Sequence, residues 1–195
     1  MSKSLRILLA EDEYIFLMSL KSDLEDLGHQ VVEEALDGKE AVELAIEKKP
    51  DLILMDINMP SLDGIEAIKQ INNVLSIPAI IITGYSNKEL VKRATDVGIF
   101  GYLVKPVDIK EIGPAIDVAL TRFQEYQAVK EELDDTKEAL ESRKYIERAK
   151  GILMDRKNIS EPEAMKLLQK KSNDTNTRLV VIAKDIIKAD EALNF

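Results

Sequence analysis

The sequence predicts an α/β fold: a five-stranded parallel, doubly wound sheet, followed by a long helix and a small three-helix module. Two observations lead to this prediction. Over residues 1–122, short apolar runs alternate with amphipathic helical segments, which is the order expected for a parallel sheet covered by helices on both faces. After residue 122 the short apolar runs stop, and only helical periodicity remains.

The five expected strands are the apolar runs 6–10, 31–35, 52–55, 79–83 and 102–104. Between them, helical periodicity predicts helices over 14–27, 39–48, 65–73 and 87–97, and a further helix that begins after Asp108 and includes Pro114. In the first helix, Ile15, Met18, Leu20, Leu24 and Leu27 are expected near one face.

Composition narrows the class of protein. The 195 residues suffice for one large domain or two small ones, and 45% hydrophobic with 32% charged residues is typical of a soluble globular chain. The absence of cysteine excludes a disulfide framework and a cysteine-based zinc site. No apolar run approaches the roughly 18 residues of a membrane span. A cytoplasmic protein without a membrane partner is therefore expected.

Charge is unevenly distributed along the chain. The net charge is −8 over residues 1–122 (13 basic, 21 acidic), −5 over 123–142 (2 basic, 7 acidic) and +6 over 143–188 (12 basic, 6 acidic). An acidic front and a basic back indicate modules with different functions. We expect three segments, at 1–122, 123–145 and 146–195.

Polar residues stand where the expected strands end. Glu11 and Asp12 follow the first strand, Asp56 follows the third, Thr83 ends the fourth and Lys105 follows the fifth. Parallel strands bring their carboxyl ends to one edge, so these residues are expected to converge. Each acid taken alone would be an ordinary solvated loop residue, but the complete set indicates a site.

The chemistry expected of this set is phosphoryl transfer. Crowded carboxylates repel one another unless a cation compensates, and Mg²⁺ is the hard cation that a few carboxylates, carbonyls and waters would hold. Asp56 is then the natural nucleophile, forming an acyl phosphate. Lys105 and Thr83 would contact the phosphoryl oxygens.

Residues 4–122 resemble the receiver domain of two-component response regulators, a flavodoxin-like fold. The resemblance rests on Leu9-Ala10-Glu11-Asp12-Glu13, Leu54-Met55-Asp56-Ile57-Asn58-Met59-Pro60, Asp63-Gly64, Ile82-Thr83-Gly84 and Tyr102-Leu103-Val104-Lys105-Pro106. It implies that Asp56 accepts phosphate from a sensor histidine kinase. It also implies that Asp12, Asp56 and the Asn58 carbonyl bind Mg²⁺ with help from Glu11 through water, that Thr83 and Tyr102 form a switch pair, and that the bond between Lys105 and Pro106 is cis.

The segment after Phe123 has a heptad-like seam. Its members are Tyr126, Val129, Leu133, Thr136 and Leu140. The seam is short and is weakened by Thr136, so we expect a long helix with a marginal pairing face and a homodimer on activation. The alternative is a single helix packed on its own receiver domain.

The basic C-terminal segment shows three helical stretches, one of which opens at Ser160-Glu161-Pro162-Glu163 with the spacing of a capping box. It resembles an ANTAR domain, the RNA-binding output module of antitermination regulators, through Ile146-Glu147-Arg148-Ala149-Lys150-Gly151-Ile152-Leu153-Met154 and Asn176-Thr177-Arg178-Leu179. The resemblance implies binding of RNA hairpins, with Lys150 and Arg178 as the first expected contacts and Arg148, Lys170 and Lys171 as further ones. Gly151 in mid-helix is expected to admit close approach of another helix or of RNA.

These features predict a response regulator, rather than an enzyme, in which phosphorylation of Asp56 controls RNA hairpin binding and transcription antitermination. A DNA-binding regulator and a protein-interaction adaptor are the alternatives. The first would need a compact recognition helix with adjacent base-reading side chains, which the sequence lacks.

Overall fold

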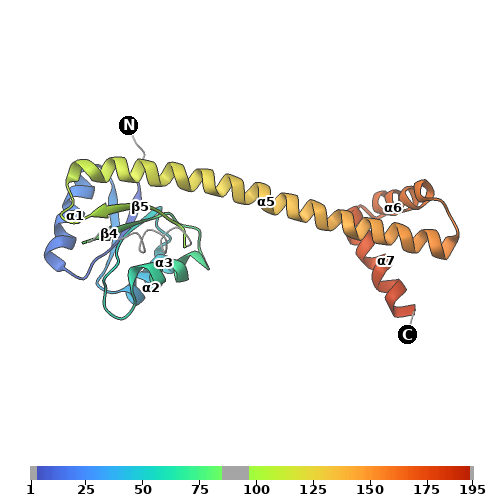
Figure 1. Cartoon of the computed structure of the whole chain (residues 1–195), viewed down its shortest axis with the longest axis horizontal. Coiled ribbons are helices and arrows are strands. Elements are labelled where there is room, and N and C mark those ends of the chain that lie inside the picture. Colours follow the sequence, from blue (N-terminus) through green and yellow to red (C-terminus); the bar gives the residue numbers. More distant parts are fainter. Residues whose placement is uncertain (1–3, 85–96, 194–195) are drawn as a thin grey trace. The chain divides into compact units, whose positions relative to one another are not determined.

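The computed structural model describes residues 4–84 and 97–193. The chain divides into two compact units, Met1–Gln127 and Ala128–Phe195, which we describe separately (Figure 1). No helix among the described residues is long and apolar enough to cross a membrane.

The first unit is built on a five-stranded sheet. Its strands are β1 (Arg6–Ala10), β2 (Gln30–Ala35), β3 (Leu52–Asp56), β4 (Ala79–Thr83) and β5 (Ile99–Val104). The strand order is β2-β1-β3-β4-β5, and every neighbouring pair is parallel. The chain steps from β1 outward to β2 and then returns past β1 to β3, which is the switch point of a doubly wound sheet. The expected fold class is confirmed.

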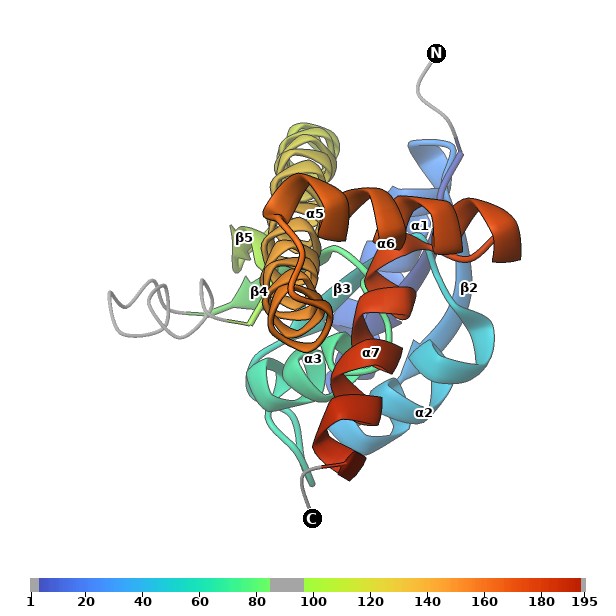
Figure 2. The same cartoon turned by 90° about the vertical axis from the view of Figure 1, so that its right-hand side faces the viewer.

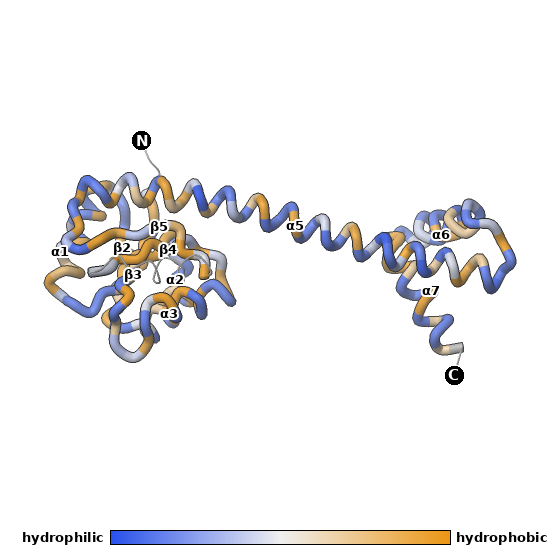
Figure 3. The backbone as a smooth tube through the Cα atoms, in the orientation of Figure 1, coloured by the Kyte–Doolittle hydropathy of each residue, from blue (hydrophilic) through white to orange (hydrophobic). Residues whose placement is uncertain are grey.

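Alternate residues of the strands point to opposite faces of this sheet. Ile53 and Met55 of β3 pack with α2 (Gly38–Lys48) and α3 (Gly64–Asn72), whereas Leu52 and Leu54 pack with α1 (Tyr14–Asp26) and the first turns of α5 (Ile109–Lys157). Because both faces are covered, the central strands β3 and β4 are buried over their whole length and are almost entirely apolar, and Figure 3 shows them mainly in orange. The edge strand β2 carries Glu33 and Glu34 and is only partly buried. The helix expected over 87–97 lies outside the described residues, apart from its last position.

The buried face of α1 differs from the expected one. Leu17, Leu20 and Leu24 are buried, whereas Ile15 and Met18 are exposed. The buried positions follow a spacing of three and four residues, and Phe16 packs beside them as a partly buried residue. The sequence prediction made the buried face of α1 too wide, because Ile15 and Met18 are apolar but do not face the sheet.

Helix α5 (Ile109–Lys157) is one continuous helix of 49 residues. The backbone N–H of Lys110 donates to Asp108 Oδ1 at 2.9 Å, so the helix begins where its N-terminal signal indicated. Pro114 lies inside the helix. The segment boundaries expected at residues 122 and 145 both fall within α5, and the two compact units divide between Gln127 and Ala128.

The second unit contains the end of α5, then α6 (Glu161–Thr175) and α7 (Leu179–Leu193), which Figure 2 shows as two separate helices after the turn that ends α5. The core is formed by Ala149, Leu168, Ile182, Ala183 and Ile187. At the start of α6, the Ser160 backbone N–H donates to Glu163 Oε2 at 2.9 Å, so the expected capping interaction is present.

Two stretches of α5 have open surroundings. Val129, Leu133 and Leu140 of the heptad-like seam are exposed, and Figure 3 shows this part of α5 as mainly hydrophilic with isolated hydrophobic positions. A Cβ added at Gly151 would meet no atom within 4 Å. No helix among the described residues therefore explains Gly151 by close approach.

Candidate functional site

The register of the sheet brings the site residues together. Ala10 of β1 lies beside Met55 of β3. Glu11 and Asp56, which directly follow these two residues, are therefore neighbours at the carboxyl edge of the sheet. On the other side, Thr83 of β4 pairs with Val104 of β5, and the Lys105 backbone N–H donates to the Thr83 carbonyl at 2.9 Å. Residues up to 94 positions apart thus meet at one edge.

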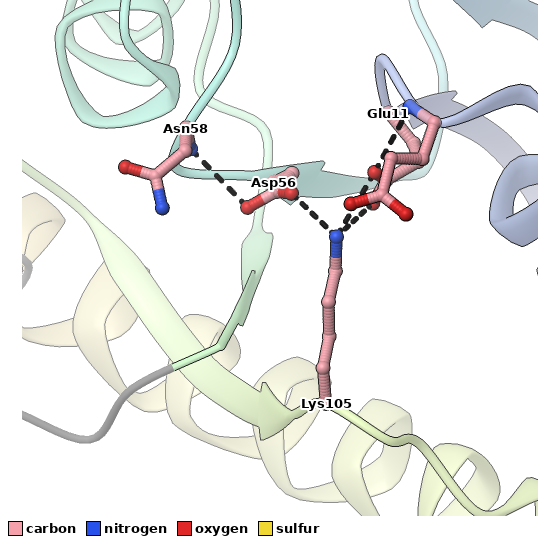
Figure 4. A network of polar contacts seen from close by, with 5 residues as sticks. Glu11, Asp56, Asn58 and Lys105 are labelled. Carbon is pink, nitrogen blue, oxygen red and sulfur yellow. Dashed lines mark hydrogen bonds and ion pairs between the residues drawn. The ribbon is translucent and has the colours of Figure 1, made fainter.

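Lys105 connects the two buried acids (Figure 4). Its ammonium lies 2.6 Å from Asp56 Oδ2 and 2.9 Å from Glu11 Oε2. The Asn58 backbone N–H donates to the other Asp56 oxygen, Oδ1, at 3.2 Å. The Asp56 carboxylate is therefore held from two sides, as a positioned nucleophile requires.

Burial sets the electrostatics of the pair. Glu11 is fully buried and Asp56 is 4% exposed. Loss of hydration raises the pKa of Glu11, and the hydrogen bond from Lys105 opposes this only in part. Burial lowers the pKa of Lys105, but the hydrogen bonds to Asp56 and Glu11, together with the negative charges of these two acids, leave that pKa raised. Lys105 is thus held as a cation at the site.

The acids fit a divalent cation. Glu11, Asp12 and Asp56 each offer a carboxylate oxygen, and these atoms lie within 4.8 Å of one another. Glu11 Oε2 is buried and accepts no hydrogen bond among the described residues, although the Lys105 ammonium is close. One ammonium thus serves two buried carboxylates, and a further cation at this edge would compensate the remaining negative charge. The donor set consists of hard oxygens, with exposed Asp12 open to water, which suits Mg²⁺.

The loop after Asp56 is held by residues to which the sequence assigned no role. Asp63 caps α3, and its Oδ1 accepts from the backbone N–H groups of Ile65 and Glu66, each at 3.0 Å. Gly64 donates its N–H to the Ile57 carbonyl at 2.9 Å. Phe16 is a further residue that sequence reasoning missed, with its ring centroid 4.6 Å from the Lys105 ammonium.

The expected switch pair is divided between two environments. Thr83 is buried at the end of β4, next to the backbone of Lys105. Tyr102 on β5 is 60% exposed. The peptide bond between Lys105 and Pro106 is cis, as the resemblance implied.

The basic residues expected to contact RNA also fall into two groups. Lys150 is 8% exposed, and its ammonium lies 2.8 Å from Glu147 and 2.7 Å from Glu161. Hydrogen bonds to Glu147 and Glu161 raise the pKa of Lys150. Two arginines are exposed and make ion pairs, Arg148 with Glu191 at 2.7 Å and Arg178 with Glu138 at 3.4 Å.

Lys170 and Lys171 on α6 form the second group. Both are exposed, and neither makes an ion pair within residues 4–84 and 97–193. Of the five residues expected to contact RNA, Lys170 and Lys171 are thus the two that face solvent without an ion-pair partner among the described residues. For Lys150, the spacing of three residues from Glu147 is a sequence signal for a local ion pair.

Comparison with known proteins matches both units. The model of the response regulator receiver domain matches residues 7–117, and that of the ANTAR domain matches residues 134–187. The transcriptional regulatory protein PdtaR of Mycobacterium tuberculosis is 42% identical over 183 residues, which cover 94% of this chain and 89% of that protein.

Solved structures match the first unit. The receiver domain of a modulated diguanylate cyclase from Desulfovibrio desulfuricans is 32% identical, with a TM-score of 0.58 over 63% of this chain and 98% of that one. A chain of the CheX–CheY–BeF3–Mg²⁺ complex from Borrelia burgdorferi is 25% identical, with a TM-score of 0.55 over 57% of this chain and 85% of that one.

Proposed function

Because this chain belongs to the family of response regulators that join a receiver domain to an ANTAR domain and act in transcription antitermination, we propose that Asp56 is its phosphoacceptor. We propose a sensor histidine kinase as the phosphodonor and RNA hairpins as the ligand that phosphorylation controls.

The contact between Lys105 and Asp56 is the observation that carries this assignment. The ammonium is 2.6 Å from Oδ2 and is itself partly buried, so it orients the carboxylate and offers a positive charge to the oxygens of a transferring phosphoryl group. Thr83 stands beside the Lys105 backbone and would donate its hydroxyl to the same oxygens.

Mg²⁺ would be held by Asp12 and Asp56 directly, with Glu11 acting through water and the Asn58 carbonyl completing the protein ligands. When bound, this ion supplies charge neutralisation for the crowded carboxylates and the phosphoryl group. The cation in the CheY complex that resembles this unit supports the choice of metal. Lys105 and the Asn58 backbone N–H hold the two oxygens of the Asp56 carboxylate in place.

The transfer step uses the carboxylate of Asp56 as nucleophile. One oxygen forms a bond to phosphorus while the phosphorus–nitrogen bond of the kinase phosphohistidine breaks, and the leaving imidazole takes up a proton. Lys105 remains protonated throughout, because its pKa is raised by Asp56 and Glu11. The product is an acyl phosphate on Asp56.

Intact mass spectrometry tests the assignment. Wild type incubated with acetyl phosphate and Mg²⁺ should gain one phosphate, and Asp56→Ala should gain none. Asp51→Ala is the matched control. Asp51 directly precedes β3, but its carboxylate accepts a hydrogen bond from the Arg6 backbone N–H at 2.8 Å and does not line the site. Undiminished labelling of Asp56→Ala would remove Asp56 from this role.

The output is RNA binding by the basic module. Exposed Lys170, Lys171 and Arg178 supply cations for phosphates, while unpaired loop bases supply the specificity. The acidic segment 123–145, here called the acidic linker, would oppose RNA when it lies near this surface, so phosphorylation is proposed to relieve inhibition. The proposal includes a division of the chain into three segments, 1–122, 123–145 and 146–195. It also includes dimerisation of the active form.

A titration of full-length protein against a two-hairpin RNA and a DNA duplex of equal charge tests the output. The beryllofluoride-treated protein should prefer the RNA, and Asp56→Ala should show no effect of this treatment. Tighter binding of the DNA would favour the DNA-binding alternative, whereas equal affinity for RNA and DNA with the same salt dependence would indicate non-specific charge binding and favour the adaptor. Binding of neither would favour the adaptor.

A further inference from the structure

Lys150 and Glu161 join the end of α5 to the start of α6. Lys150 lies two helical turns before Lys157, at which α5 ends, and Glu161 is the first residue of α6. Their side chains meet at 2.7 Å across a three-residue turn in which Asn158 has a positive φ of 50°. The pair therefore crosses the point at which the chain reverses.

The surroundings of Lys150 are those of a structural position. Its stem lines a hollow formed with Ile146, Pro162 and Met165, next to Ala149 in the core. Long lysine stems bury their methylenes in this way while the ammonium finds polar partners. The positive charge also lies at the N-terminus of α6, where it is tolerated because Glu161 is there to compensate.

The local charge argues against a direct contact with RNA. Lys150 with Glu147 and Glu161 forms a group of one cation and two anions, which repels phosphate as a whole. To reach a phosphate, the ammonium would have to leave both carboxylates and its buried position, and the two acids would then face the RNA uncompensated.

We propose that Lys150 is a positioning residue for RNA recognition: through Glu161 it fixes the start of α6 on α5, and so places exposed Lys170 and Lys171 for the ligand. This inference rests on the proposed function, because it concerns the same RNA surface. It assigns the effect of Lys150 to the geometry of α6 and not to a phosphate or base contact.

Salt dependence separates the two roles. A lysine that contacts phosphate releases counterions, so its loss lowers the magnitude of the slope of log affinity against log salt by about 0.7–0.9. A positioning residue instead lowers the fraction of molecules in which α6 is correctly placed, so affinity falls while the bound complex keeps the same phosphate contacts and the same slope. The probe is the two-hairpin RNA that full-length wild type selects from a pool with randomised loops.

Three variants of the full chain are compared with wild type at several salt concentrations. Lys150→Met, which keeps the apolar stem, should weaken binding about tenfold with an unchanged slope. Lys170→Met, the matched control at an exposed lysine, should lower the slope. The charge-swapped double variant Lys150→Glu with Glu161→Lys restores the ion pair, keeps the charge of the group, and should return affinity to within about threefold of wild type.

The inference is overturned if Lys150→Met lowers the slope, if it leaves affinity unchanged, or if the double variant binds no better than Lys150→Met. The double variant keeps the test decisive should Lys150→Met fold poorly. If wild type selects no RNA from the pool, the proposed function fails and this inference falls with it, an outcome distinct from the others because wild type itself shows no binding.

Discussion

A Cβ added to Gly64 would lie 2.0 Å from the backbone carbonyl oxygen of Asp56. The first residue of α3 thus packs directly on the backbone of the residue that carries the site. No side chain fits at this position unless the loop after β3 moves, so glycine is needed here for close approach.

Gly64→Ala should therefore lower the free energy of unfolding by about 1–3 kcal/mol, the usual cost of overpacking, and slow phosphorylation by acetyl phosphate. Gly113→Ala is the control in the same unit, because a Cβ there meets nothing within 4 Å; it should leave phosphorylation close to wild type and raise the free energy of unfolding by up to about 1 kcal/mol, since Gly113 lies inside α5. Chemical denaturation and phosphorylation rates measure the effects. Equal behaviour of the two variants would show that the loop accommodates the methyl group.

The exposed carboxylate of Asp12 is expected to contribute to Mg²⁺ binding without supporting the fold. Asp12→Asn should weaken Mg²⁺ about tenfold, which corresponds to about 1.4 kcal/mol, and should leave thermal stability unchanged or slightly raised because like charges are removed. Calorimetric titration of Mg²⁺ measures this. Glu13→Gln, an exposed neighbour outside the carboxylate group, is the control, and equal weakening in both would argue against a ligand role for Asp12.

The exposed seam on α5 predicts dimerisation of the activated protein. Leu133→Asp should reduce the dimer fraction seen by sedimentation after beryllofluoride treatment, because it places a charge in the apolar stripe. Ala128→Asp adds the same charge at an exposed position off the seam and should dimerise as wild type does. A dimer fraction that Leu133→Asp leaves unchanged would assign pairing to another surface.

Gly151 lies in the interior of α5 with open space where a side chain would be. Gly151→Ala should raise the free energy of unfolding of the module by about 1 kcal/mol, since glycine is costly in a helix. If RNA approaches this backbone, the same variant should bind RNA more weakly although it is more stable. Thermal unfolding and RNA titration measure both, and a lower melting temperature would contradict the open position.

The ion pair at the α5–α6 turn predicts a dependence on pH. The hydrogen bond from Lys150 lowers the pKa of Glu161 below its usual 4.5. The stability from this shift is fully present above pH 4.5 and is lost as the pH falls through the folded-state pKa. In Lys150→Met the pKa of Glu161, measured by carboxyl NMR titration, should rise toward 4.5; an unchanged pKa would rule out the pair in solution. Glu163 is the internal control, because its lowered pKa comes from Ser160.

Local patterns determined much of this protein. Strands β1 and β4 begin and end at the expected residues, because buried parallel strands are short, continuous apolar runs bounded by polar residues. The convergence of Glu11, Asp56 and Lys105 also followed from the sequence, since each stands at a strand end and parallel strands share an edge. The capping residues Asp108 and Ser160 located two helix starts because their hydrogen bonds are local.

Other features depended on contacts between residues distant in the sequence. Periodicity places Lys150 on a helix, but only the packing of α6 against α5 brings Glu161 to its ammonium and pairs this largely buried lysine with an exposed carboxylate. The need for glycine at residue 64 arises from the Asp56 carbonyl, which no pattern within α3 reveals. Sequence periodicity reports which residues share a face of one element, whereas the partner that occupies that face is decided by how elements pack, and that is a property of the tertiary structure.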